Sequence, residues 1–232
     1  MGSAASPEQA APKAGLIPQR KPAVVRFRWA ILAGALAAGV GIGGAIALLR
    51  HSSPAITSGT TPPVETWAAG TRRAPAFVLH DETGKVLSLA ALHGRPVIVT
   101  FIDPLCRDFC PREASVISAA AKAVAPRSPA IVAISVDPWG DTKQNFRADA
   151  AHWRLAPQWR WGIGSAAELS PVWRGYGVGV LVTKKRIAGI TVREITHTGA
   201  AYLIDASGYE RALFLYPFKT SDLVDALRAL PT

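Results

Sequence analysis

Cysteine is nearly absent from this chain: its 232 residues include only Cys106 and Cys110, with three residues between them. A disulfide that closes so short a loop removes little entropy from the unfolded chain, so stabilisation alone is a poor reason for the pair. Two thiolates are also too few ligands to hold a metal ion well, so a metal site needs a third ligand from elsewhere. The pair therefore points to chemistry rather than to a structural staple.

Acidic residues are scarce, because 16 Asp and Glu stand against 26 Lys and Arg and leave a net charge of +10. The basic residues are scattered instead of forming one cluster, which argues against nucleic acid as a partner. A mildly basic surface suits anionic lipid headgroups or an acidic partner. No internal repeat is found in the sequence, and the length suits one medium domain with additional residues at one end.

Charge is missing altogether from Trp29 to Leu49, a run of 21 residues. A helix of this length spans about 30 Å, which is the thickness of a bilayer core. A cleavable signal peptide is the alternative, but the run is longer than the apolar part of such a peptide, so we expect an uncleaved transmembrane helix. Five basic residues precede the run, and after Arg50 the next basic residue is Arg72, which predicts a cytoplasmic N-terminus.

These features predict four segments. They are a disordered cytoplasmic tail at residues 1–28, a transmembrane helix at 29–49, a linker rich in Ser, Thr, Pro and Gly at 50–73, and a thioredoxin-like domain at 74–232. The protein would be a single-pass inner (plasma) membrane protein whose domain lies on the periplasmic, extracytoplasmic side. Outside the cytoplasm, a close cysteine pair can become oxidised and stay so.

Strand and helix signals alternate in the soluble part. Continuous apolar runs predict strands buried on both faces, and apolar residues at helical spacing predict helices. The expected strands and hairpins are residues 76–89, 95–103, 130–137, 159–164 and 200–216, and the expected helices are residues 110–125, 142–153, 166–178 and 219–230. This order predicts an α/β sandwich with a central mixed sheet of the thioredoxin-like kind, preceded by a single transmembrane helix.

The cysteine pair stands where a buried strand gives way to a helix. Pro111 favours the first helical position, which would place Cys110 near the N-cap and Cys106 in the loop before it. Backbone N–H groups and the helix dipole favour anions there, so both thiols are expected to ionise below the ordinary pKa of about 8.5. The spacing allows either a redox-active disulfide or a shared metal ion, and both chemistries stay open.

Histidine is the obvious source of a third ligand. His51 lies at the predicted membrane edge, and His80, His93 and His152 are expected to be solvated or to pack against neighbours. His197 comes immediately before a predicted strand. In a thioredoxin-like fold the segment that enters this strand lies beside the cysteine loop, so His197 is the best candidate.

Four stretches together carry a family resemblance: FVLHDETGKVLSLAALHGRPVIVTF, CRDFCP, AISVDPWGDT and THTGAAYLID. In this order, from about Ala74 to Leu230, they resemble the Sco/SenC family. These are membrane-anchored thioredoxin-like proteins that bind copper and assist assembly of the CuA centre of cytochrome c oxidase. The resemblance implies one copper ion per domain, Cu(I) and/or Cu(II). It also implies as partners the oxidase subunit that carries the CuA site, and other copper chaperones or thiol reductants.

By the same resemblance, Cys106 and Cys110 are the sulfur ligands, His197 is the nitrogen ligand, and Asp137 is an acidic residue near the site. The chain departs from the family pattern at a few positions. Asp103 and Pro104 replace an aromatic residue and threonine, Arg107 replaces proline, and Gly140 stands where arginine is common.

Two other functions fit parts of the pattern. A thiol–disulfide oxidoreductase needs an exposed, low-pKa cysteine and a resolving neighbour. Generic members carry CxxC and a proline before the following strand, whereas this chain has CxxxC and the sequence His197-Thr198-Gly199 there. Residues 74–97 also resemble the opening of a peroxiredoxin-like peroxidase. Such an enzyme needs Thr or Ser three residues before its reactive cysteine, and this chain has Asp103 and Arg107 at those places.

Overall fold

The computed structural model describes residues 62–231. The predicted tail, the predicted transmembrane helix, His51 and residues 50–61 of the predicted linker lie outside the described residues. Within residues 62–231, no helix combines the length and the apolar character needed to cross a membrane. The last part of the predicted linker contains the short strand β1 (Glu65–Thr66), which pairs with the C-terminal hairpin of the domain.

The centre of the domain is a six-stranded mixed sheet with the order β1-β10-β9-β4-β5-β6. Strand β4 is parallel to β5, and β5 is parallel to β6, whereas β9 runs antiparallel to both β4 and β10. All six residues of β4 and of β5 are buried, because both faces of the sheet are covered. The predicted α/β sandwich with a mixed central sheet is therefore confirmed. The bounds of these strands are Val97–Ile102 (β4), Ala130–Ser135 (β5), Trp159–Gly162 (β6), Ala200–Ile204 (β9) and Glu210–Leu215 (β10).

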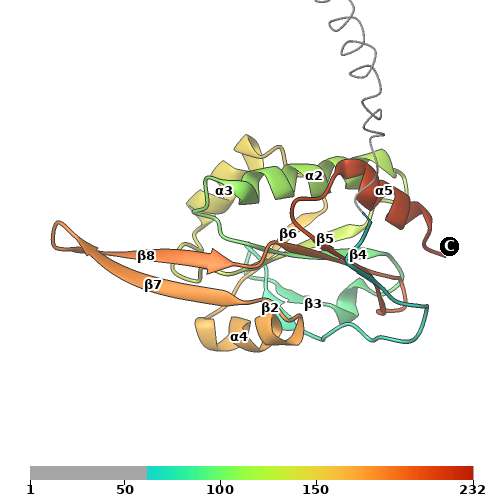
Figure 1. The fold of residues 1–232 in the computed structure, drawn as a ribbon, viewed down its shortest axis with the longest axis horizontal. Helices are drawn as coiled ribbons and strands as arrows, with labels where there is room; N and C mark the ends of the chain where they lie inside the picture. The colour runs from blue at the N-terminus through green and yellow to red at the C-terminus, as the bar shows by residue number, and fades with distance from the viewer. Residues whose placement is uncertain (1–61, 232) are drawn as a thin grey trace, which may run out of the picture. The chain divides into compact units, whose positions relative to one another are not determined.

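Two layers cover the sheet (Figure 1). Successive residues of β4 point to opposite faces, so Ile98 and Ile102 join one apolar cluster while Val99 and Phe101 join the other. On one side lie helices α2 (Phe109–Ala123), α3 (Lys143–His152) and α5 (Thr220–Arg228). On the other lie helix α4 (Ala166–Gly175), the hairpin of β2 (Val78–His80) and β3 (Val86–Ser88), and the short 3-10 helix η1 (Ala90–Leu92).

A long hairpin formed by β7 (Val180–Ile187) and β8 (Ile190–His197) extends away from this sandwich, as Figure 1 shows. Its two strands pair only with each other and form a separate sheet. Ala188 and Gly189 both have positive φ, which is the backbone of a two-residue turn that suits the twist of the strands. The hairpin was not predicted. Most of its side chains are exposed, so it lacks the apolar alternation by which a half-buried strand is recognised.

Candidate metal and thiol site

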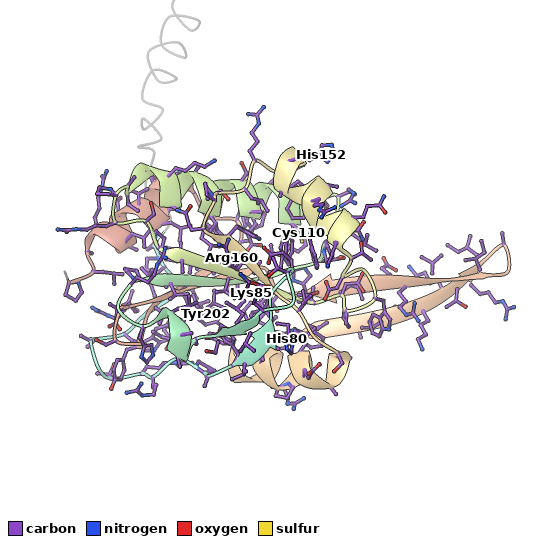
Figure 2. All side chains as sticks on the ribbon, turned by 180° about the vertical axis from the view of Figure 1, so that it is seen from behind. His80, Lys85, Cys110, His152, Arg160 and Tyr202 are labelled. Carbon is purple, nitrogen blue, oxygen red and sulfur yellow. The ribbon has the colours of Figure 1, made fainter. Side chains whose placement is uncertain are left out.

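The pairing of β9 with β4 brings the two predicted halves of the site together. Because the strands are antiparallel, with Thr100 opposite Ala201, β9 begins beside the end of β4 that leads into the cysteine loop. His197 is the last residue of β8, just before β9, and its Nε2 atom lies 3.5 Å from Cys110 Sγ. Figure 2 shows Cys110 near the base of the projecting hairpin. The expectation that His197 lies beside the cysteine loop is confirmed.

Helix α2 begins slightly earlier than the sequence suggested. Asp108 occupies the N-cap position, Phe109 is the first helical residue, and Pro111 is the third instead of the first. The early N–H groups of a helix have no partner within it, so proline fits anywhere in this turn. Cys110 therefore lies inside the first turn, where it is 0% exposed.

The His197 ring has one defined tautomer. Its Nδ1 atom lies 3.2 Å from the carbonyl oxygen of Thr198. A carbonyl oxygen can only accept, so Nδ1 carries the hydrogen and Nε2 presents a lone pair toward Cys110. Burial lowers the pKa of the ring, so the imidazole is neutral at physiological pH. A neutral imidazole held through Nδ1, with Nε2 free, is the form that binds metal ions.

The two thiols are free and differ in their ionisation. The hydrogen bond from Cys110, aided by backbone N–H groups at the start of α2, lowers the pKa of the half-buried Cys106 to about 6. The same hydrogen bond, together with burial, raises the pKa of Cys110. At pH 7 the pair therefore holds one proton, on Cys110, whose single S–H hydrogen has two neighbouring acceptors, the Cys106 thiolate and His197 Nε2. The expectation that both thiols ionise easily is wrong for Cys110, because burial opposes its charged form.

The predicted ligands are neighbours, but they do not yet form a three-ligand cluster. Cys110 is linked to His197 on one side and to Cys106 on the other. In the described part of the chain, no three His, Cys, Asp or Glu side chains are grouped closely enough to hold a metal ion. The joint assignment of Cys106, Cys110 and His197 as ligands stays a prediction.

The remaining described histidines lie elsewhere. His80, His93 and His152 are exposed. Figure 2 shows His152 at the outer end of its helix and His80 on the opposite side of the sheet, both away from Cys110. The expectation that these three are solvated or pack against other neighbours agrees with their exposed positions.

Asp137 is buried in the loop after β5, and Oδ1 of its carboxylate accepts the Trp139 N–H at 3.2 Å. Gly140 follows, and a Cβ atom there would lie 2.5 Å from Asp137 Oδ2 and 2.9 Å from Leu105 Cγ. Glycine at this position therefore lets the Asp137 carboxylate and Leu105 pack together, which accounts for one departure from the family pattern. The role of Asp137 beside the site stays a prediction.

Asp103 and Arg107, two of the other departures, shape the loop that carries Cys106. The Asp103 carboxylate accepts the Leu105 N–H at 2.7 Å, and its carbonyl oxygen accepts the Cys106 N–H at 3.1 Å. Arg107 Nη1 donates to the carbonyl oxygens of Pro104 and Cys106, at 3.0 and 2.9 Å, and lies 3.8 Å from Asp149 Oδ1. At these positions, which differ from the family pattern, side-chain hydrogen bonds to the backbone therefore stabilise the loop.

The sequence did not reveal a group of carboxyl groups near Cys106. Burial raises the pKa of Asp103 and of Asp149 to about 6, and the pKa of Asp141 to about 7. The charge of Asp137 adds to the effect on Asp103 and Asp141. Asp137 and Asp141 lie in one loop, but Asp103 and Asp149 come from two other segments of the chain, so no local motif could have indicated the whole group.

Glu113 is a second functional candidate that the sequence analysis missed. It is 0% exposed, and burial raises its pKa to about 8. Its Oε1 atom lies 2.7 Å from Thr100 Oγ1, which lies 3.0 Å from the Ala200 carbonyl oxygen. One hydroxyl hydrogen cannot serve both acceptors, so a protonated Glu113 donates to Thr100, which donates to Ala200. Its spacing of three residues from Cys110, on the buried stripe of α2, was the available signal.

The comparisons with known proteins agree with this geometry. The sequence model of the SCO1/SenC family matches residues 67–231. No curated protein matches the chain. Copper-bound ScoI from Bradyrhizobium japonicum is 25% identical with a TM-score of 0.59, and the match covers 68% of this chain and 99% of ScoI.

Two more distant structures support the fold. BsSco, described as having a disulfide switch and as a member of the Sco family of cytochrome c oxidase assembly proteins, is 20% identical with a TM-score of 0.54. That match covers 72% of this chain and 94% of BsSco. The thioredoxin domain of a thiol-disulfide oxidoreductase from Bacteroides vulgatus is 18% identical with a TM-score of 0.50, over 71% of this chain and 96% of that domain. The fold is thus thioredoxin-like, and with the family match across nearly all the described residues, the chain belongs to the SCO1/SenC family.

Proposed function

We propose that this protein binds one copper ion through Cys106, Cys110 and His197 and delivers or prepares it for the CuA site of cytochrome c oxidase. The observation that carries the proposal is the neutral His197 imidazole, whose Nε2 lone pair faces the buried Cys110 sulfur at 3.5 Å. Membership of the family and the copper-bound relative ScoI support it.

The donor set suits the soft ion Cu(I), because thiolates and imidazole are its preferred ligands in proteins. At pH 7 Cys106 is already a thiolate, and Cys110 holds the one proton between the two sulfur atoms. Copper would take the place of this proton, so binding of Cu(I) should release about one proton near neutral pH. Cu(II) would also favour nitrogen and oxygen donors.

The two sulfur atoms differ in how a partner can reach them. Cys110 is fully buried, whereas Cys106 is half-buried beside the exposed Leu105. Copper passes between proteins by exchange of ligands, so a partner thiolate would first meet the ion from the side of Cys106. Cys110 and His197 would hold the ion from within until the exchange is complete.

A second function, thiol–disulfide exchange, is favoured by the same asymmetry of the thiols. Exchange needs an accessible low-pKa cysteine and a second thiol that resolves the mixed disulfide. Cys106 fits the first role and Cys110 the second. The disulfide switch described for BsSco supports a redox role for the cysteine pair.

We also propose that residues 29–49 anchor the protein in the inner (plasma) membrane, with a cytoplasmic N-terminus and the domain on the extracytoplasmic side. The subunit that carries the CuA site, other copper chaperones and thiol reductants would be its partners there. Treatment of spheroplasts with protease tests this orientation, because external protease should digest the domain. Protection of the domain would contradict it.

Copper stoichiometry tests the main proposal. The purified protein, loaded anaerobically with Cu(I) and desalted, should retain about one copper per chain by elemental analysis. Cys106→Ala and His197→Ala should each retain much less, whereas His152→Ala, an exposed histidine on α3, should bind like the wild type. Full binding by both site variants would refute the copper site. If thiol exchange is the main role, His197→Ala should keep its exchange activity.

A further inference from the structure

The two faces of the β7–β8 hairpin differ in chemistry. Residues opposite each other across an antiparallel pair share a face, and the faces alternate along each strand. The register therefore places four exposed apolar side chains on one face: Leu181, Ile187, Ile190 and Val192. It places three basic side chains on the other face: Lys184, Arg186 and Arg193. We call this second face the cationic face, and His197 lies at its base.

The charges of the cationic face are not neutralised within the domain. The ion pair of this hairpin, between Lys185 and Glu194, lies on the apolar face. Among the described residues, Lys184 and Arg186 form no salt bridge. Lys184 also lies directly opposite Arg193, and like charges in opposed positions destabilise a strand pair. A two-stranded hairpin is only marginally stable, so repulsion between Lys184 and Arg193 is costly. An anionic surface bound to this face would relieve the repulsion.

The cationic face is continuous with the entrance to the thiol site. The guanidinium of Arg193 lies 4.9 Å from the centre of the Trp139 ring, and this ring is 47% exposed. Trp139 belongs to the same loop as Gly140, which packs against Leu105. Leu105 is 48% exposed and is the neighbour of Cys106. One surface therefore runs from the hairpin to the accessible sulfur.

We propose that the cationic face is the docking surface for an acidic protein. This partner would exchange Cu(I) with the site or undergo thiol–disulfide exchange with its cysteines. The inference rests on the proposed function and names the chemistry of its partner. A second copy of this chain would bring the same positive charges and be repelled. A lipid bilayer would be approached by the apolar face, which is turned away from the side that carries His197 and Arg193.

The test compares two synthetic peptides that carry the same Cys-x-x-x-Cys pair, one flanked by aspartates and the other by serines. Transfer of Cu(I) from the loaded full-length protein in neutral detergent is followed by stopped flow at low and at high salt. The acidic peptide should react about tenfold faster at low salt, and 0.5 M salt should remove the difference. Lys184→Glu with Arg186→Glu should reverse the preference. Equal rates for the two peptides with the wild type would overturn the proposal.

Two further variants control for the change in net charge and for misfolding of the hairpin. Arg127→Glu with Arg228→Glu makes the same change of net charge near the hollow at the opposite end of the sheet, and it should keep the preference for the acidic peptide. Lys184→Gln with Arg186→Gln removes the like-charge repulsion in the hairpin, so it should fold well and lose most of the preference. A preference that survives this neutral variant would overturn the proposal.

The same peptides separate failure of the docking surface from failure of the copper proposal. If the protein retains no copper, the reaction measured is reduction of the peptide disulfides: the Cys106 thiolate attacks, and Cys110 resolves the mixed disulfide and releases the peptide dithiol. A preference for the acidic peptide would then support the docking surface while the copper proposal fails.

Binding to phosphatidylglycerol vesicles is the third measurement. If the Lys184→Glu, Arg186→Glu variant loses only vesicle binding and keeps the peptide preference, the cationic face is a lipid surface.

Discussion

His197 and Cys110 meet with Nε2 and Sγ 3.5 Å apart, although 87 positions separate them in the chain. Helix α2 fixes one of them and the end of β8 fixes the other, and the antiparallel pairing of β9 with β4 holds the two elements together. The site is therefore built from the sheet outward. Changes that shift β9 against α2 should alter the site without touching either side chain.

The first prediction concerns the different reactivity of the two thiols. Cys106 should be alkylated by iodoacetamide at pH 7, with a rate that titrates near pH 6, because the hydrogen bond from Cys110 stabilises its thiolate. Cys110→Ala removes this donor, so the midpoint should move to higher pH. Mass mapping of the modified peptide and rates across pH 5 to 9 check both statements. Preferential alkylation of Cys110 would contradict the assignment.

The second prediction tests the packing of the loop that carries His197. A Cβ atom on Gly199 would lie 3.0 Å from Tyr216 Cβ and 3.2 Å from Glu113 Oε2. Gly199→Ala should therefore push the loop away from α2, with a loss of about 1–3 kcal/mol in stability and weaker Cu(I) binding. Gly179→Ala is the matched control, because its Cβ meets Thr198 Oγ1 at an ordinary 3.6 Å. Thermal unfolding and Cu(I) competition measure both effects, and equal behaviour of the two variants would refute this view.

The third prediction concerns Arg107, whose guanidinium ties two carbonyl oxygens of the cysteine loop. Arg107→Ala should loosen the loop and weaken Cu(I) binding, and Arg107→Lys should not restore it, because an ammonium group lacks the planar set of donors. Loss of the positive charge should also raise the pKa of Asp149 further, since Arg107 opposes the effect of burial there. Arg112→Ala, at an exposed position of α2, serves as control. Competition with a Cu(I) chelator measures affinity, and full rescue by lysine would contradict the role of geometry.

The fold and the site differ in how much the sequence could reveal. Continuous apolar runs predicted β4 and β5 because both strands are buried on both faces. The place of His197 followed from the thioredoxin-like order of elements. The β7–β8 hairpin was not predicted, because it makes little contact with the core and its sequence therefore lacks the apolar pattern of a buried strand. The raised pKa of Cys110 was also not predicted. It results from burial in the core, which depends on tertiary packing that a local motif does not encode.

The last prediction concerns Glu113, which is buried and protonated beneath the site. Burial raises its folded-state pKa to about 8, above the ordinary value near 4.5. Its neutral form therefore stabilises the fold fully below about pH 4.5. This contribution declines as pH rises to about 8, at up to about 1.4 kcal/mol per pH unit, and then stays constant.

Glu113→Gln keeps a neutral donor for Thr100 and has no proton to lose. Its melting temperature, relative to the wild type, should rise steadily from pH 5 to pH 8 and then level off. Glu194→Gln, at an exposed position of the hairpin, is the matched control. Because the bond chain from Glu113 ends at Ala200, near His197, the Cu(I) affinity of the Gln variant relative to that of the wild type should rise at pH 8 to 9, where Glu113 ionises. Melting temperatures that change in parallel with pH for wild type and Glu113→Gln would show that Glu113 is ionised in the folded protein. The single Thr100 hydroxyl hydrogen would then face two acceptors, Glu113 and the Ala200 carbonyl oxygen.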